Sequence, residues 1–66
     1  MEAYVYSPDG EFRWNHINII PRLGELVVIN KDDFTSSRGV VRDVRYDQWV
    51  DGSLKITIFI GEDNNE

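Results

Sequence analysis

The chain has no cysteine, only one histidine and no long apolar run, and each absence excludes a class of protein. Without cysteine there is no disulfide and no thiolate metal site, and His16 has no second imidazole with which to bind zinc. The sequence contains no run of about 18 apolar residues, the length that a transmembrane helix needs. Glu2 and Asp9 stand where a secretory signal has basic and then apolar residues. We therefore expect a cytoplasmic protein with no membrane contact, metal or cofactor.

Positive charge is also scarce, because seven Lys and Arg residues stand against twelve Asp and Glu residues and leave a net charge of −5. Such a surface repels phosphate groups, which disfavours nucleic acid as a partner. The 66 residues suffice for one domain and not for two. A domain of this size buries only ~60% of the surface of its unfolded chain, so stabilisation by a partner is plausible.

The residue types that carry catalysis form no recognisable pattern. A serine nucleophile would have His16 as its only imidazole base, with no orienting group nearby. The pair Asp32-Asp33 is followed by hydroxyl residues but lacks the spacing of a calcium loop. The chain is also small for a pocket of the usual ~300 Å³ or more. We predict that the protein is not an enzyme.

Turn residues divide the chain into five strand-like segments, and no window has the spacing of an amphipathic helix. The expected strands cover residues 2–7, 11–19, 25–30, 38–49 and 53–60. The polar stretch 31–37 is expected to be the longest and most mobile loop. The predicted fold class is therefore all-β.

Ser7-Pro8-Asp9-Gly10 predicts the first hairpin, with glycine in the left-handed region. A three-residue loop would bring four aromatic side chains to one face, namely Tyr4, Tyr6, Phe12 and Trp14. Such a face either fills the core or forms a platform for methylated lysine or single-stranded nucleic acid.

The second hairpin is expected to turn through a three-residue loop, Val50-Asp51-Gly52, with glycine left-handed. This register places apolar opposite apolar residues and one acid opposite a base, in the pairs Tyr46–Ile56, Val44–Ile58 and Asp47–Lys55. Val41 and Val44 are three apart and cannot both face inward in a regular strand, which predicts a β-bulge near Arg42-Asp43.

The central block of the sequence contains Pro21-Arg22-Leu23-Gly24-Glu25 before one strand and Gly39-Val40-Val41-Arg42-Asp43-Val44 within the next. It resembles the SH3-like barrels of small bacterial and phage proteins, in which Pro-x-x-Gly-Glu leads into a strand and Gly-x-Val-x-x-Val follows a variable loop. The resemblance covers residues 21–60 and implies a small five-stranded antiparallel barrel, a scaffold used mostly for binding. Tudor-like and KOW-like barrels of unrelated function share it.

The expected domain spans residues 1–61, with the aromatic hairpin as an extended N-terminal addition and residues 62–66 as a frayed acidic tail. Eight side chains are expected to fill the barrel: Val27, Ile29, Val41, Val44, Tyr46, Ile56, Ile58 and Ile60. Five others are left outside and are the candidate partner-binding residues: Leu26, Val28, Phe34, Trp49 and Phe59.

This apolar surplus predicts a non-catalytic protein-binding module, acting as a small homo-oligomer or as an adaptor or inhibitor that docks on a larger protein. One alternative is a nucleic-acid-binding SH3-like barrel that uses Arg38, Arg42 and Arg45. Asp43 and Asp47 are interleaved with these arginines, which favours ion pairs across a neighbouring strand. A further alternative is an acidic mimic of nucleic acid of phage origin.

Overall fold

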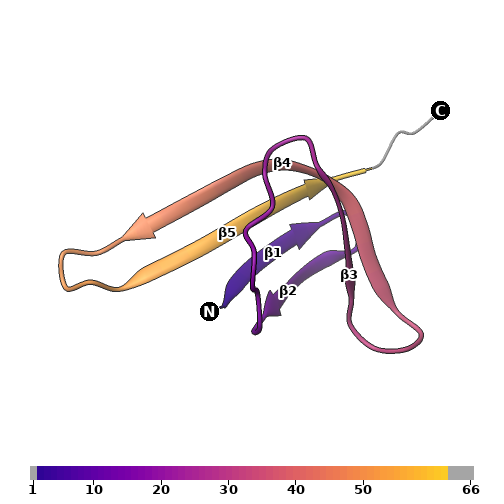
Figure 1. Ribbon diagram of the computed structural model, residues 1–66, viewed down its shortest axis with the longest axis horizontal. Helices are drawn as coiled ribbons and strands as arrows, with labels where there is room; N and C mark the ends of the chain where they lie inside the picture. Colours follow the sequence, from indigo (N-terminus) through magenta and orange to yellow (C-terminus); the bar gives the residue numbers. More distant parts are fainter. Residues whose placement is uncertain (1, 63–66) are drawn as a thin grey trace.

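The computed structural model describes residues 2–62, which form five β-strands and no helix (Figure 1). The strands are β1 (Ala3–Ser7), β2 (Gly10–Trp14), β3 (Leu26–Asn30), β4 (Ser36–Gln48) and β5 (Leu54–Gly61). The prediction of an all-β fold is confirmed. Within the described range, no helix is long and apolar enough to cross a membrane. Apart from Glu62, the tail expected to fray lies outside the described residues.

The strand order is β2-β1-β5-β4-β3, and every neighbouring pair is antiparallel except β1 and β5, which are parallel. The expectation of a purely antiparallel sheet is therefore wrong. The parallel pair places Val5 opposite Ile58, so that both face the core. Because the alternation of a strand reads the same in both directions, it determines which face is buried and leaves the direction of pairing open.

The sheet curls into a half-barrel whose two edges are β2 and β3. No Cα atom of β2 lies within 8 Å of a Cα atom of β3, so these edges face each other without pairing. Paired strands lie only ~4.8 Å apart. The barrel expected from the sequence is thus open along one side.

The β4–β5 hairpin has the predicted register. Its pairs include Val44–Ile58, Tyr46–Ile56 and Asp47–Lys55. The turn is closed by hydrogen bonds from Trp49 N to Ser53 O and from Gly52 N to Trp49 O, both 2.9 Å, and Gly52 has a φ of +96°. The predicted bulge is also confirmed, as a register shift between Val41 and Asp43.

The β1–β2 hairpin has a different register from the one predicted. Gly10 pairs with Ser7 as a strand residue with a φ of +124°, and the Ser7 hydroxyl donates to the Gly10 carbonyl oxygen at 2.9 Å. The loop therefore has two residues instead of three. This shift separates the aromatic side chains, since Phe12 and Trp14 now pack against the core while Tyr4 and Tyr6 lie on the other face.

The connection between β2 and β3, residues 15–25, is the longest one, where a longer second strand was expected. The expected long loop after β3 is shorter, residues 31–35. Residues 15–25 cross the inner face of β4 and β5 (Figure 1), and Ile17 is buried in the core. Gly24 N donates to Val41 O and Val41 N donates to Glu25 O, each at 2.9 Å, which joins the end of this crossing loop to β4.

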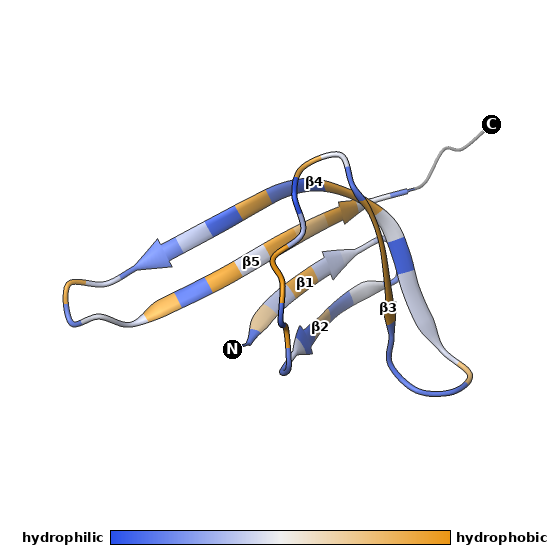
Figure 2. Ribbon diagram, viewed as in Figure 1, coloured by the Kyte–Doolittle hydropathy of each residue, from blue (hydrophilic) through white to orange (hydrophobic). Residues whose placement is uncertain are grey.

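The core lies between the crossing loop and the strands β1, β5, β4 and β3. Figure 2 shows that apolar residues recur along these elements. Its buried members are Ala3, Val5, Ile17, Ile29, Val41, Ile56, Ile58 and Ile60. Of the side chains expected inside, Val27 and Val44 are partly buried against this cluster, whereas Tyr46 is exposed. The expectation that Tyr46 fills the barrel is therefore wrong, because the crossing loop does not cover it.

Candidate functional site

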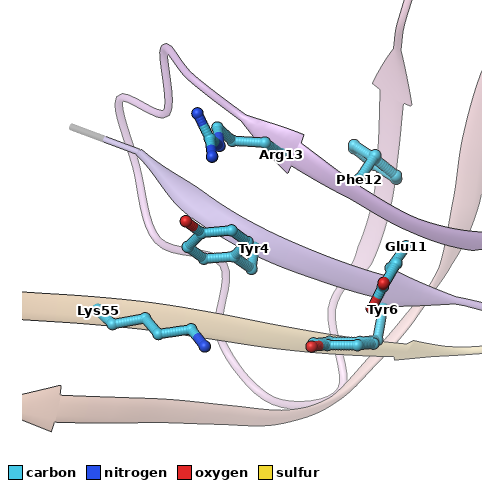
Figure 3. A pocket seen from close by; sticks show the side chains of 6 residues that line it. All are labelled: Tyr4, Tyr6, Glu11, Phe12, Arg13 and Lys55. Carbon is cyan, nitrogen blue, oxygen red and sulfur yellow. The ribbon is translucent and has the colours of Figure 1, made fainter.

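The outer face of β1, β2 and β5 carries an aromatic cluster (Figure 3). The Tyr6 ring stacks on the Phe59 ring, with centroids 5.3 Å apart and ring planes 14° apart. The Arg13 guanidinium lies 5.5 Å and the Lys55 ammonium 4.9 Å from the centroid of the Tyr4 ring. Each such cation–aromatic contact contributes about 0.5–1 kcal/mol at an exposed site.

A shallow pocket of about 420 Å³ is lined by six of the side chains on and beside this face: Tyr4, Tyr6, Glu11, Phe12, Arg13 and Lys55. A concave site of this size corrects the expectation that the chain is too small to have one. The pocket offers an aromatic ring between two cations, which suits a planar or anionic group. The predicted register put Arg13 on the face opposite Tyr4, whereas the observed register pairs the two residues. Lys55 comes from a strand that is distant in sequence and could not be assigned to this site.

The three arginines of the predicted basic strand do not form one basic surface. Arg45 Nη2 lies 3.1 Å from Asp47 Oδ1, so the ion pair runs along β4 and not across to a neighbouring strand as expected. The Arg42 side chain crosses Gly61 and donates to the Glu62 carbonyl oxygen at 3.2 Å. Arg38 lies opposite Val28 at the other end of β4.

The five candidate partner-binding residues lie in separate places. Leu26 and Val28 are exposed on the edge strand β3. Phe34 is 96% exposed in the β3–β4 turn, and Trp49 is exposed at the opposite end of β4. The 13 residues of β4 would span about 43 Å, so one ordinary side-chain contact cannot join these two aromatics. Phe59 is half-buried by its stacking on Tyr6. The binding role of all five stays a prediction.

A further set of exposed apolar side chains was not predicted as a set. It consists of Leu23, Tyr46, Trp49, Val50 and Leu54, which belong to the distal end of the β4–β5 hairpin and the adjoining loop and are here called the distal patch. Leu23 and Tyr46 line one shallow depression of about 450 Å³ where the crossing loop meets β4. The others lie at the projecting end of the β4–β5 hairpin (Figure 2). The alternation of apolar residues in this hairpin predicts that Tyr46 faces inward. The sequence therefore assigned Tyr46 to the core and not to an exposed surface.

A groove lies along the open side of the half-barrel, with β3 on one side and β2 and the start of the crossing loop on the other. Two adjoining depressions of about 490 and 700 Å³ form it, and both are lined by Trp14 and His16. The first depression also contains Arg13, Ile29 and Lys31. The Lys31 ammonium lies 4.7 Å from the centroid of the Phe12 ring and so crosses from the end of β3 to β2.

The two carboxylates whose pKa values are lowered stabilise turns. The backbone N–H groups of Phe34 and Thr35 donate to Asp32 and lower the pKa of its carboxyl below 3.8. The hydroxyl and the backbone N–H of Ser53 lower the pKa of Asp51 in the same way. Over residues 2–62, no group of three or more His, Cys, Asp or Glu side chains is placed to hold a metal ion.

No protein-family model, curated protein or solved structure matches this chain.

Proposed function

We propose that this protein is a non-catalytic protein-binding module, acting as a small homo-oligomer or as an adaptor or inhibitor that docks on a larger protein. The observation that supports this function is the distal patch, where five large apolar side chains are exposed in one region. Monomeric proteins seldom expose contiguous apolar surface of this kind, and aromatic residues such as Tyr and Trp are frequent anchors at protein interfaces.

The scaffold is proposed to be an opened variant of the SH3-like barrel. In support, Pro21 to Glu25 lead directly into β3, and the segment from Gly39 to Val44 forms the bulged centre of β4. A binding role accords with the uses of such barrels, although a fold alone does not determine a function.

The experiment is a comparison of two surface variants. Trp49→Lys combined with Leu54→Lys changes the distal patch, and Asp9→Lys adds the same two units of positive charge at an exposed position of the β1–β2 turn as a matched control. We expect wild type and Asp9→Lys to associate, either with themselves in sedimentation at increasing concentration or with one protein in crosslinking in the source cells. The distal variant should stay folded and lose that association. Equal association of all three proteins, or none by any of them, would contradict the proposal.

One observation favours nucleic acid as a second candidate partner, namely the Tyr4 ring between Arg13 and Lys55. Aromatic stacking combined with basic side chains is the usual basis for binding single strands. The net charge of −5 opposes this function. We therefore expect no retention on heparin and no micromolar binding to single-stranded or duplex DNA at physiological salt. Steeply salt-dependent binding that Tyr4→Ala abolishes would put this function first.

A further inference from the structure

We propose that the groove between β2 and β3 binds an extended peptide of a partner protein, which adds a strand at the open side and places a carboxylate beside Lys31. This inference rests on the proposed protein-binding function and names the kind of segment that is bound.

Both edge strands have a free side. Each has backbone N–H and C=O groups there, and such edges are templates for pairing with another chain. The Cα atoms of β2 and β3 are all more than 8 Å apart, so the two edges do not pair with each other. An extended peptide in the groove would pair with the free edge of β3, which ends beside Lys31.

The walls of the groove supply apolar contacts for alternate side chains of the peptide. Trp14 lines both depressions, Ile29 lines the first, and Leu26 and Val27 line the second. In peptide recognition by strand addition, main-chain hydrogen bonds provide affinity, and pockets for every second side chain provide specificity. The bound segment should therefore alternate apolar and polar residues.

The charge of the groove selects an acidic segment. The first depression contains Arg13, His16 and Lys31 and has no carboxylate among its lining residues, although the protein as a whole is acidic. Glu25 is in the second depression, away from Lys31. A peptide carboxylate at the first depression would attract the Lys31 ammonium, which lies over the Phe12 ring across the gap and also interacts with the charge of the exposed Asp32 carboxylate. Charge complementarity of this kind determines both specificity and register.

The test uses the full chain and a library of random peptides of about nine residues displayed on phage. We expect the enriched peptides to alternate apolar and polar residues and to contain Asp or Glu. In ¹⁵N NMR titrations with the synthesised peptides, the backbone amides of β2 and β3 should shift. N-methylation of alternate peptide amides should weaken binding by about tenfold or more, because it removes the donors needed for strand pairing.

Lys31→Glu should weaken binding of the acidic peptides by about tenfold, whereas Lys55→Glu should change it by less than about twofold. The control is matched, because both lysines contact an aromatic ring and Lys55 lies outside the groove. Circular dichroism establishes that both variants are folded.

The proposal is overturned if no peptide is enriched, if N-methylation has no effect, or if β2 and β3 shift only on self-association. Enriched peptides that shift the distal patch instead would overturn the groove and leave the proposed function standing. Loss of association by the distal variant with unchanged peptide binding would support both surfaces separately.

Discussion

The two halves of the β4–β5 hairpin share one alternating pattern but differ in burial. In the proximal half, Ile58 is fully buried and Val41 is almost so. In the distal half, Tyr46 and Leu54 face the same side of the sheet and are 54% and 46% exposed. The strand lengths explain the difference, because β1 has five residues and spans about 17 Å, whereas β4 would span about 43 Å.

Alternation assigns side chains to one face of the hairpin, whereas burial requires a further element that covers this face. In the proximal half the crossing loop, with Ile17 in the core, covers this face, and β1 extends the sheet beside β5. The loop ends its cover beside Tyr46. An uncovered inner face is therefore either a stability cost or a binding surface.

The largest effect is expected from truncation in the proximal half. Ile58→Ala should lower the free energy of unfolding by about 3 kcal/mol, because Ile58 is buried between β1 and β4 and its removal leaves a cavity. Leu54→Ala should cost less than about 1 kcal/mol, because half of that side chain already contacts water. Urea denaturation followed by tryptophan fluorescence measures both. Similar losses would contradict the contrast between the halves.

The second-largest effect is expected at Gly39, where β4 lies close to the end of β5. A Cβ atom at Gly39 would overlap the Gly61 carbonyl oxygen and the Ile60 side chain. Gly39→Ala should therefore lower the free energy of unfolding by about 2 kcal/mol. In Gly61→Ala the new atom meets only the flexible Arg42 side chain, so the loss should be below about 1 kcal/mol. The urea midpoints of the two variants test this order. A lower midpoint for Gly61→Ala than for Gly39→Ala would contradict it.

Much of the β4–β5 hairpin could be predicted from the sequence, because several independent signals agree on one register. The pairing of Asp47 with Lys55, that of Val44 with Ile58 and the position of Gly52 all indicate the same three-residue turn. The β1–β2 hairpin offered no such agreement. Residues 3–6 are all apolar or aromatic, so both registers place an apolar residue inward.

The candidate sites were less predictable, because they combine segments that no local pattern connects. The approach of Lys55 to Tyr4 depends on the parallel pairing of β1 with β5. The groove depends on the distance between β2 and β3, which results from the curl of the whole sheet. Leu26 and Val28 were correctly expected to be exposed from their alternation with Val27 and Ile29.

A third, smaller change in stability is expected from replacing the glycines of the two hairpin turns. Gly10 and Gly52 have φ values of +124° and +96°, and neither has an atom near an added Cβ, so substitution costs backbone conformation alone. Gly10→Val should destabilise the protein by more than about 1 kcal/mol, since its turn holds Val5 in the core. Gly52→Val should destabilise it less, because the distal end can unfold locally without exposing the buried cluster. A negligible change for Gly10→Val in thermal or urea unfolding would remove the first turn assignment.

The smallest change in stability is expected from replacing the turn carboxylates, Asp32 in the β3–β4 turn and Asp51 in the distal turn. Donation by the Phe34 and Thr35 backbone N–H groups lowers the pKa of Asp32, and the hydroxyl and backbone N–H of Ser53 lower that of Asp51, both below 3.8. A carboxyl whose pKa is lowered in the folded state stabilises the protein fully when the pH is above its pKa in the unfolded state. It loses this contribution as the pH falls through its pKa in the folded state.

Asp32→Asn should therefore reduce the urea midpoint slightly at neutral pH, and the difference from wild type should shrink below pH 3.8. Asp51→Asn should produce the smaller change, because its turn belongs to the uncovered half of the hairpin and contributes less to global unfolding. A difference from wild type that grows on acidification would mean that the carboxylates do not hold these turns.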